Sequence, residues 1–172
     1  MIRSGASLNV LDEFQDFPLD EAAHENRPDI AEMLLAAGAD PKLTTPAGST
    51  ALMRAAWSGS VAVAKLLLEH GAQVNAADVH GETALILASQ TCPDGVMVQL
   101  LLDHGADPNA QGPAALIAAA GHPMVVEKLL KAGADPAAKD AYGHTVEDAA
   151  CDRGEKGHFE VCTLVRQALG KK

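Results

Sequence analysis

The dipeptide Gly-Ala recurs along this chain at nearly constant intervals, and this regularity restricts the possible folds more than any other feature. It occurs at Gly5-Ala6, Gly38-Ala39, Gly71-Ala72, Gly105-Ala106 and Gly133-Ala134, with separations of 33, 33, 34 and 28 residues. A leucine-rich segment such as "KLLLEHGAQ" precedes each of the last four. A period of this length indicates a repeat protein, in which each unit buries its apolar face only against its neighbours.

Each period predicts two helices. A threonine such as Thr50 is a good N-cap for the first helix, which carries a pair of small residues, as at 55–56, and allows close helix packing. After a turn near Gly59, the second helix has one apolar stripe, Val63, Leu66 and Leu67 in this period. The equivalent stripe residues are Ile30, Met33 and Leu34 in one period, and Val125, Leu129 and Leu130 in another. Glycine ends the second helix because it tolerates the left-handed conformation.

The combined pattern, "GxTALxxAxxxG" followed by "LLxxGAxxN", resembles the ankyrin repeat and covers nearly the whole chain. The resemblance implies an all-α ankyrin-repeat solenoid of stacked helix-turn-helix pairs with β-hairpin-like finger loops. We expect a single domain over residues 1–172. Its repeats would span 1–11 (partial), about 12–44, 45–77, 78–110, 111–138 and 139–172.

Three departures from the family pattern stand out. The usual histidine of the first helix is absent, and its positions hold Asp20, Met53, Ile86 and Glu147. The fourth repeat is shortened by about five residues. The first ten residues match the end of a repeat whose two helices are missing, so either the cap is minimal or the natural protein starts earlier.

Composition limits the partners. The net charge of −10 and pI near 5 argue against nucleic acid, because such binding depends on clustered Lys and Arg, and they favour a basic protein partner. The longest apolar run, "AALIAAAG" at 114–121, is too short to span a membrane, so no membrane association is expected. We expect a monomeric, cytoplasmic protein.

The three cysteines, Cys92, Cys151 and Cys162, are odd in number and lack the spacing of a disulfide framework or a zinc site. This favours a reducing compartment. Cys162 is expected in the core of the last helix, whereas Cys92 and Cys151 are expected to be exposed at the ends of first helices.

No pattern of residues predicts an enzyme, a cofactor or a metal site. His70 and His104 occupy equivalent repeat positions, which lie roughly 10 Å apart in packed helices, too far to share a metal ion. The chain has no phosphate-binding glycine loop and no nucleophile in a recognisable context. We therefore expect a non-enzymatic protein.

In ankyrin-repeat proteins, partners usually bind the concave surface formed by finger tips and the exposed end of each first helix. The resemblance carries this role to His24, Glu25, Trp57, Ser58, Val79, His80, Glu82, Gln90, Tyr142, His144 and Asp152. The only tryptophan and the only tyrosine of the chain, Trp57 and Tyr142, are in this set. Such side chains are enriched in binding hot spots, although each would alternatively pack over a neighbouring repeat as a partly buried cover.

Six carboxylates and no Lys or Arg lie between residues 12 and 25. They would either form a solvated end cap or speed the encounter with a basic partner. The sequence thus favours a protein–protein interaction module. Two alternatives remain: an immunity or inhibitor protein that neutralises a basic effector or toxin, and an ankyrin segment of a longer regulatory protein.

Overall fold

The computed structural model describes residues 8–151 and 156–170. Within those ranges the regular secondary-structure elements are all α-helices. The one β-type pairing among the described residues is an isolated antiparallel bridge between Ala77 and Thr83. The predicted all-α class is therefore confirmed. By its internal contacts the chain divides into two units, Met1–Ala84 and Leu85–Lys172, which are considered separately.

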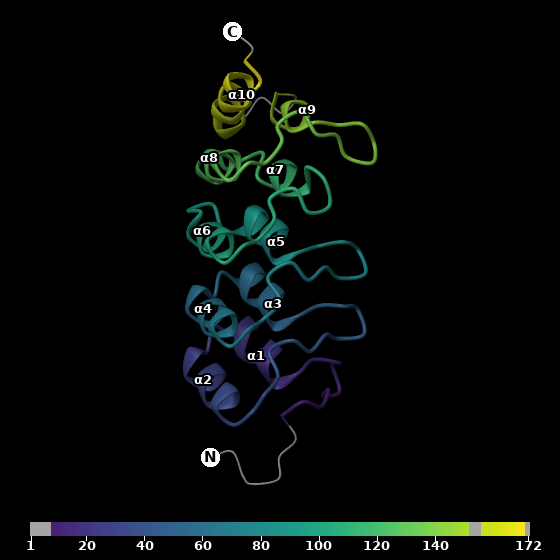
Figure 1. Cartoon of the computed structure of the whole chain (residues 1–172), viewed down its shortest axis with the longest axis vertical. Helices are drawn as coiled ribbons and strands as arrows, with labels where there is room; N and C mark the ends of the chain where they lie inside the picture. The colour runs from purple at the N-terminus through teal and green to yellow at the C-terminus, as the bar shows by residue number, and fades with distance from the viewer. Residues whose placement is uncertain (1–7, 152–155, 171–172) are drawn as a thin grey trace. The chain divides into compact units, whose positions relative to one another are not determined.

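The first unit contains two antiparallel helix pairs (Figure 1). The helices are α1 (Pro18–His24), α2 (Pro28–Ala36), α3 (Ala51–Ser58) and α4 (Val61–Glu69). Helix α1 packs on α2 and α3, and α4 packs on α3 and α2. Each pair therefore contacts the next through both of its helices, as a helix-turn-helix repeat requires.

The second unit also consists of helix pairs, but its helices differ more in length. Its helices are α5 (Ala84–Thr91, whose first residue closes the first unit), α6 (Val96–Asp103), α7 (Ala114–Ala118), α8 (Pro123–Lys131), α9 (Val146–Cys151) and α10 (Lys156–Ala168). Helix α7 has only 5 residues, which accommodates the deletion predicted in the fourth repeat. Helix α8 packs on α6, α7 and α10, and α9 packs on α7 and α10.

Helix ends follow the predicted signals. Thr50 Oγ1 accepts a hydrogen bond from the backbone N–H of Met53 (3.2 Å) and caps α3. At the end of α4, the N–H of Ala72 donates to the carbonyl of Leu67 (2.9 Å), and that of Gly71 donates to Leu68 (3.0 Å). This pattern needs a left-handed residue, and Gly71 has φ +85°. Gly38, Gly105 and Gly133 also have positive φ.

The apolar stripes are buried as predicted in the interior pairs and only partly in the first. Val63, Leu67, Val125 and Leu129 are fully buried, while Leu66 and Leu130 are half-buried. In α2 the prediction fails for two residues, because Ile30 is 37% and Met33 is 49% exposed. Ile30 instead lines an open cavity, together with residues of α1 and with Val10 and Asp12.

Asp20 fills the position of the missing family histidine in α1. It is buried, and its Oδ2 accepts a hydrogen bond from the backbone N–H of Phe17 (2.9 Å), which begins the helix. Burial raises the pKa of Asp20 to about 6; Asp16 and Asp12 add to this effect, whereas the Phe17 N–H and Arg54 oppose it.

The expectation that no cysteine forms a disulfide is wrong. Cys151 at the end of α9 is bonded to Cys162 in α10, with the Cα atoms 5.5 Å apart. The prediction failed because the two residues lie on different helices, 11 positions apart, and meet only through the packing of α10 on α9. Cys162 is buried and Cys151 exposed, as expected, but Cys92, outside the disulfide, is buried rather than exposed.

We expect Asp20→Asn to change the pH dependence of stability. A carboxyl with a raised folded-state pKa contributes stability below its unfolded pKa, and that contribution is lost as pH rises through the folded value. The free energy of unfolding of the wild type should therefore fall by on the order of 3 kcal/mol relative to that of the variant between about pH 4 and pH 7. Urea unfolding at several pH values measures this; a constant difference between the two proteins would contradict it.

The disulfide predicts a specific thiol count. Unfolded without reductant, the protein should react with maleimide at one cysteine, Cys92, and after reduction at three. In the native state, Cys92 should react slowly because it is buried. Mass spectrometry of the labelled protein gives the count, and three labels without reductant would exclude the bond.

Candidate partner-binding surface

Three finger turns share one hydrogen-bond pattern, at Thr45–Ser49, Asp78–Glu82 and Asp140–His144. In each, the first residue donates its N–H to the carbonyl of the last, at 2.9 to 3.0 Å. The N–H of the glycine in the turn donates back to the first residue's carbonyl, at 2.8 to 3.0 Å. The finger backbone is therefore fixed by its own contacts.

Aspartate begins two of these turns and binds their backbone. Asp78 Oδ1 accepts from the N–H groups of His80 (2.8 Å) and Glu82 (2.9 Å), and Asp140 Oδ1 accepts from Tyr142 and His144 (both 2.8 Å). The hydrogen bond from the His144 N–H is the main cause that lowers the pKa of Asp140. These aspartates are thus structural.

The finger tips expose the side chains between those anchoring points. Val79 is 66% and Tyr142 is 86% exposed, His80 and His144 are exposed, and Glu82 is half-buried. The Tyr142 and His144 rings lie 6.3 Å apart and inclined at 31°, so one finger presents two adjacent ring side chains.

In the first unit, two fingers are in direct contact. The N–H of Val79 donates to the carbonyl of Ala47 (3.0 Å). A Cβ atom added to Gly48, whose φ is +80°, would lie 3.0 Å from the Cα of Asp78. The two fingers therefore approach as closely as a residue without a side chain permits.

The predicted residues at the ends of α1 and α3 are also neighbours. The Ser58 hydroxyl donates to the carbonyl of Ala23 (2.9 Å), the residue before His24. Ser58 Oγ also lies 2.8 Å from Ser60 Oγ, so its hydroxyl is engaged within the fold. His24 Nδ1 and Glu25 Oε1 are 3.3 Å apart, and both side chains are exposed. Trp57 is 52% exposed, which excludes a fully buried role.

The remaining predicted residues belong to the second unit. Gln90 is exposed near the end of α5, and Asp152 lies outside the described residues. The predicted surface therefore consists of helix-end and finger residues in the first unit, and of Gln90 with the Tyr142 finger in the second.

The acidic run is less available than the sequence suggested. Asp16 pairs with Arg54 (2.6 Å), Asp20 is buried, and Asp12 Oδ1 accepts from the N–H groups of Phe14 and Asp16. Half of the six carboxylates thus serve the fold, which leaves Glu13, Glu21 and Glu25 as the exposed charges without such a role.

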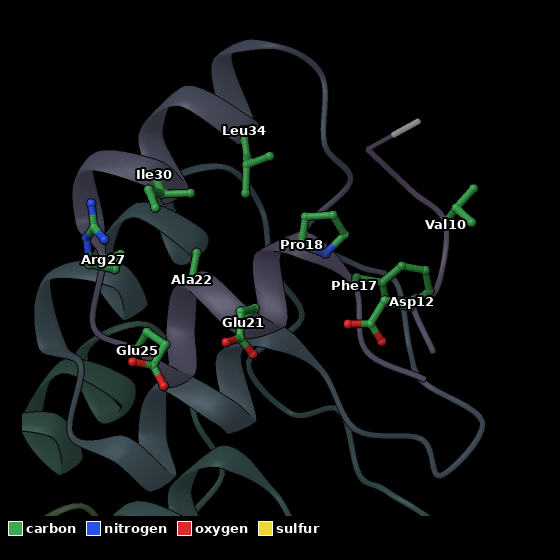
Figure 2. Close-up of a pocket in the computed structure, with 10 residues that line it drawn as sticks. All are labelled: Val10, Asp12, Phe17, Pro18, Glu21, Ala22, Glu25, Arg27, Ile30 and Leu34. Carbon is green, nitrogen blue, oxygen red and sulfur yellow. The ribbon is translucent and has the colours of Figure 1, made fainter. Parts of the chain in front are cut away.

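Sequence reasoning missed a cavity of about 480 Å³ in the first unit, formed by the ten residues labelled in Figure 2 and called the N-terminal groove below. Of its lining, only Glu25 was predicted as a contact residue. The one sequence signal for it was the partial repeat before residue 12, for which no helix pair is predicted. Two exposed aromatic residues, Phe14 and Phe159, were also not predicted.

Within the described ranges, no three His, Cys, Asp or Glu residues are grouped so as to hold a metal ion. None of the described helices is long and apolar enough to cross a membrane.

A family model described as "Ankyrin repeats (3 copies)" matches residues 1–78, 19–112 and 77–140. The predicted resemblance to ankyrin repeats is thus confirmed over residues 1–140.

Curated relatives agree. A putative ankyrin repeat-containing protein of Treponema pallidum is 42% identical over 88 residues, 51% of this chain and 29% of its own length. NF-kappa-B inhibitor alpha of Sus scrofa is 40% identical, covering 63% of this chain and 36% of its own length. The mouse B-cell lymphoma 3 protein homolog is 34% identical, and the match covers 84% of this chain and 34% of the relative's own length. The chain therefore spans about a third of the length of these relatives.

The contact between the two fingers predicts a difference between two glycine substitutions. Gly48 and Gly143 occupy equivalent finger positions with positive φ, but a Cβ at Gly143 would meet nothing within 4 Å. Gly143→Ala should cost about 1 kcal/mol of unfolding free energy from backbone strain alone. Gly48→Ala should cost about 1 to 3 kcal/mol more because of the clash. Equal losses in denaturant unfolding would contradict the close approach.

Proposed function

Because the chain belongs to the ankyrin repeat family, we propose that it is a non-enzymatic module that binds a protein partner through its finger tips and first-helix ends. The ankyrin repeats indicate a protein–protein interaction module. We propose in addition which surface binds, what kind of partner it binds, and that the protein is not an enzyme. One observation carries the surface assignment. The only tryptophan and tyrosine of the chain are 52% and 86% exposed at predicted contact positions.

Exposed aromatic side chains at defined positions favour binding for a physical reason. Trp and Tyr bury a large area when a partner covers them, yet they lose little rotamer entropy. In the first unit, Trp57 at the end of α3 and Val79 on a finger provide apolar area, with His80 and Glu82 beside Val79. In the second unit, Tyr142 and His144 provide an adjacent pair of rings.

The supporting backbone is prearranged. The Asp78 and Asp140 carboxylates bind the finger backbone internally, and Ser58 ties the end of α3 to α1. Binding a partner therefore costs little conformational entropy at these residues, which favours a high affinity. Ser58 acts in this proposal as support, and its hydroxyl is not a partner ligand.

Charge supports a basic partner. The net charge is −10, and Glu25 and Glu82 lie within the predicted contact set. A complementary field raises the association rate and rejects acidic competitors. We propose a monomeric protein without a cofactor; cytoplasmic location stays a prediction, and the Cys151–Cys162 disulfide removes the cysteine argument for it.

A second candidate is an immunity or inhibitor protein that neutralises a basic effector or toxin. Its support is the acidity of the chain together with similarity to a protein named as an inhibitor, NF-kappa-B inhibitor alpha. A third candidate, an ankyrin segment of a longer regulatory protein, is supported by relatives of about three times the aligned length. The reading frame upstream of residue 1 separates the third candidate from the others.

Capture from extracts of the source cell tests the surface. Wild type and Trp57→Ala or Tyr142→Ala variants with unchanged circular dichroism are compared, and partners are quantified by mass spectrometry. Loss of a hot-spot aromatic side chain should weaken the affinity for the specific partner by about tenfold or more. The partner should also dissociate more readily as salt increases.

Phe159→Ala is the matched control for these variants. Phe159 is 78% exposed but lies on α10, outside the predicted contact set, so its removal should leave capture unchanged. Retention of every partner by both the Trp57 and Tyr142 variants, or an equal loss with the Phe159 variant, would refute the proposed surface.

A further inference from the structure

The N-terminal groove is an apolar depression with an acidic rim. Its floor is formed by Phe17, Pro18, Ala22, Ile30 and Leu34, from α1, α2 and the residue before α1. Glu21 of α1 and Glu25, the residue that follows α1, line it as well, and both are exposed. Figure 2 shows Ile30 and Leu34 extending from α2 on one side, with the two glutamates on the other.

The repeat symmetry shows that this face has the composition of an interface. Ile30 is equivalent to Val63, 33 residues later, and to Val125 in the second unit. Val63 and Val125 are fully buried, whereas Ile30 is 37% exposed. The position is thus buried where a preceding helix pair packs against it, as α2 packs against α4, and uncovered in α2 itself.

The same symmetry assigns a role to the glutamates. Glu21 and Glu25 are equivalent to Arg54 and Ser58 of α3. Arg54 reaches back to Asp16 (2.6 Å) and Ser58 to the carbonyl of Ala23 (2.9 Å), both in the preceding repeat. Arg54 and Ser58 therefore contact what packs on the preceding side. In the first repeat both positions hold carboxylates, which accept hydrogen bonds and pair best with cations.

The cation of the groove lining is hydrogen-bonded to a carboxylate outside the lining, although it also attracts Glu25, which lies 3.3 Å from His24 Nδ1 as well. Arg27 is the basic residue in the lining, and its guanidinium donates to both carboxylate oxygens of Asp29, at 3.0 and 2.7 Å. That pairing is also the main cause that raises the pKa of Arg27. Asp12, a third carboxylate of the lining, adds to the negative field.

A second copy of the chain is a poor complement to this groove. The helical cations whose side chains are described already contact other groups. Arg54, Lys65, Lys131 and Arg166 pair with carboxylates, and Lys128 donates to Gln99. The ion pairs of Lys65 and Lys131 are exposed and cost little to break, but the net charge of −10 opposes bringing a second copy against the acidic rim.

We propose that the N-terminal groove binds an amphipathic helix of a partner protein, whose aliphatic stripe fills the floor and whose flanking Lys or Arg residues pair with Glu21 and Glu25. This surface shares Glu25 with the finger surface proposed above but is otherwise formed by different residues, so the protein has two adjacent docking sites. The helix is recognised by an apolar stripe of i, i+3, i+4, i+7 spacing together with basic neighbours.

A designed peptide tests the recognition chemistry. The probe is a fluorescent helix of about 18 residues with leucine at i, i+3, i+4 and i+7 and lysine elsewhere. Its controls are a scrambled peptide of the same composition and a peptide with glutamate in place of lysine. By anisotropy, the lysine helix should bind the intact protein at least about tenfold more tightly than either control. Equal binding of the scrambled peptide would overturn the proposal.

Protein variants locate the binding site. Ile30→Glu should weaken binding at least about tenfold. The exposed double variant Glu21→Lys/Glu25→Lys, which is less prone to unfold, should lose the lysine helix and bind the glutamate helix instead. Glu69→Lys/Glu160→Lys makes the same change in net charge at exposed positions outside the groove and should alter the affinity less than about twofold.

The remaining outcomes are also decisive. Equal weakening by the two charge-reversal variants would show that only net charge matters and would overturn the proposal. Loss of peptide binding in Val79→Asp would place the peptide on the fingers and also overturn it. Concentration-dependent dimerisation in sedimentation, abolished by Ile30→Glu, would identify a second copy as the occupant and refute a partner helix.

Discussion

The structure depends on one constraint: a short helix pair cannot bury its own apolar face and must lie against another pair. Ala22, Ala23, Ala55 and Ala56 make this possible in the first unit, because their small side chains are buried and let α1 and α3 pack closely. Two features of the sequence support this contact. Thr50 fixes where α3 begins, and Gly71 ends α4 so that the chain can turn back toward the next finger.

The same constraint explains how much of the structure the sequence could predict. The sequence predicted the features that adjacent residues determine. These are the capping threonine, the glycine after each second helix and the buried stripe at Val63 and Leu67. The exposure of Ile30 and Met33 was not predicted, since their sequence pattern matches that of Val63 and Leu66. The pattern records which face is apolar, whereas burial depends on whether a neighbour is present.

Contacts between different helices were the other source of error. Nothing in the spacing of Cys151 and Cys162 indicates that the middle of α10 meets the end of α9. The acidic run was treated as a single field, yet Asp16 pairs with Arg54, 38 residues away, and Asp20 is buried. For the candidate surface, repeat position predicted the exposure of Trp57, Val79 and Tyr142, whereas the engagement of Ser58 with Ala23 depends on the packing of two helices.

The Cys151–Cys162 bond has a consequence for the integrity of the chain. The two cysteines enclose the connection between α9 and α10, so any single backbone cut between them leaves α10 covalently attached to the rest of the protein. Helix α10 packs on both α8 and α9 and covers the end of the second unit. Proteolysis in this connection would therefore not by itself release α10 from α8 and α9. Only the combination of a cut and a reductant would free it.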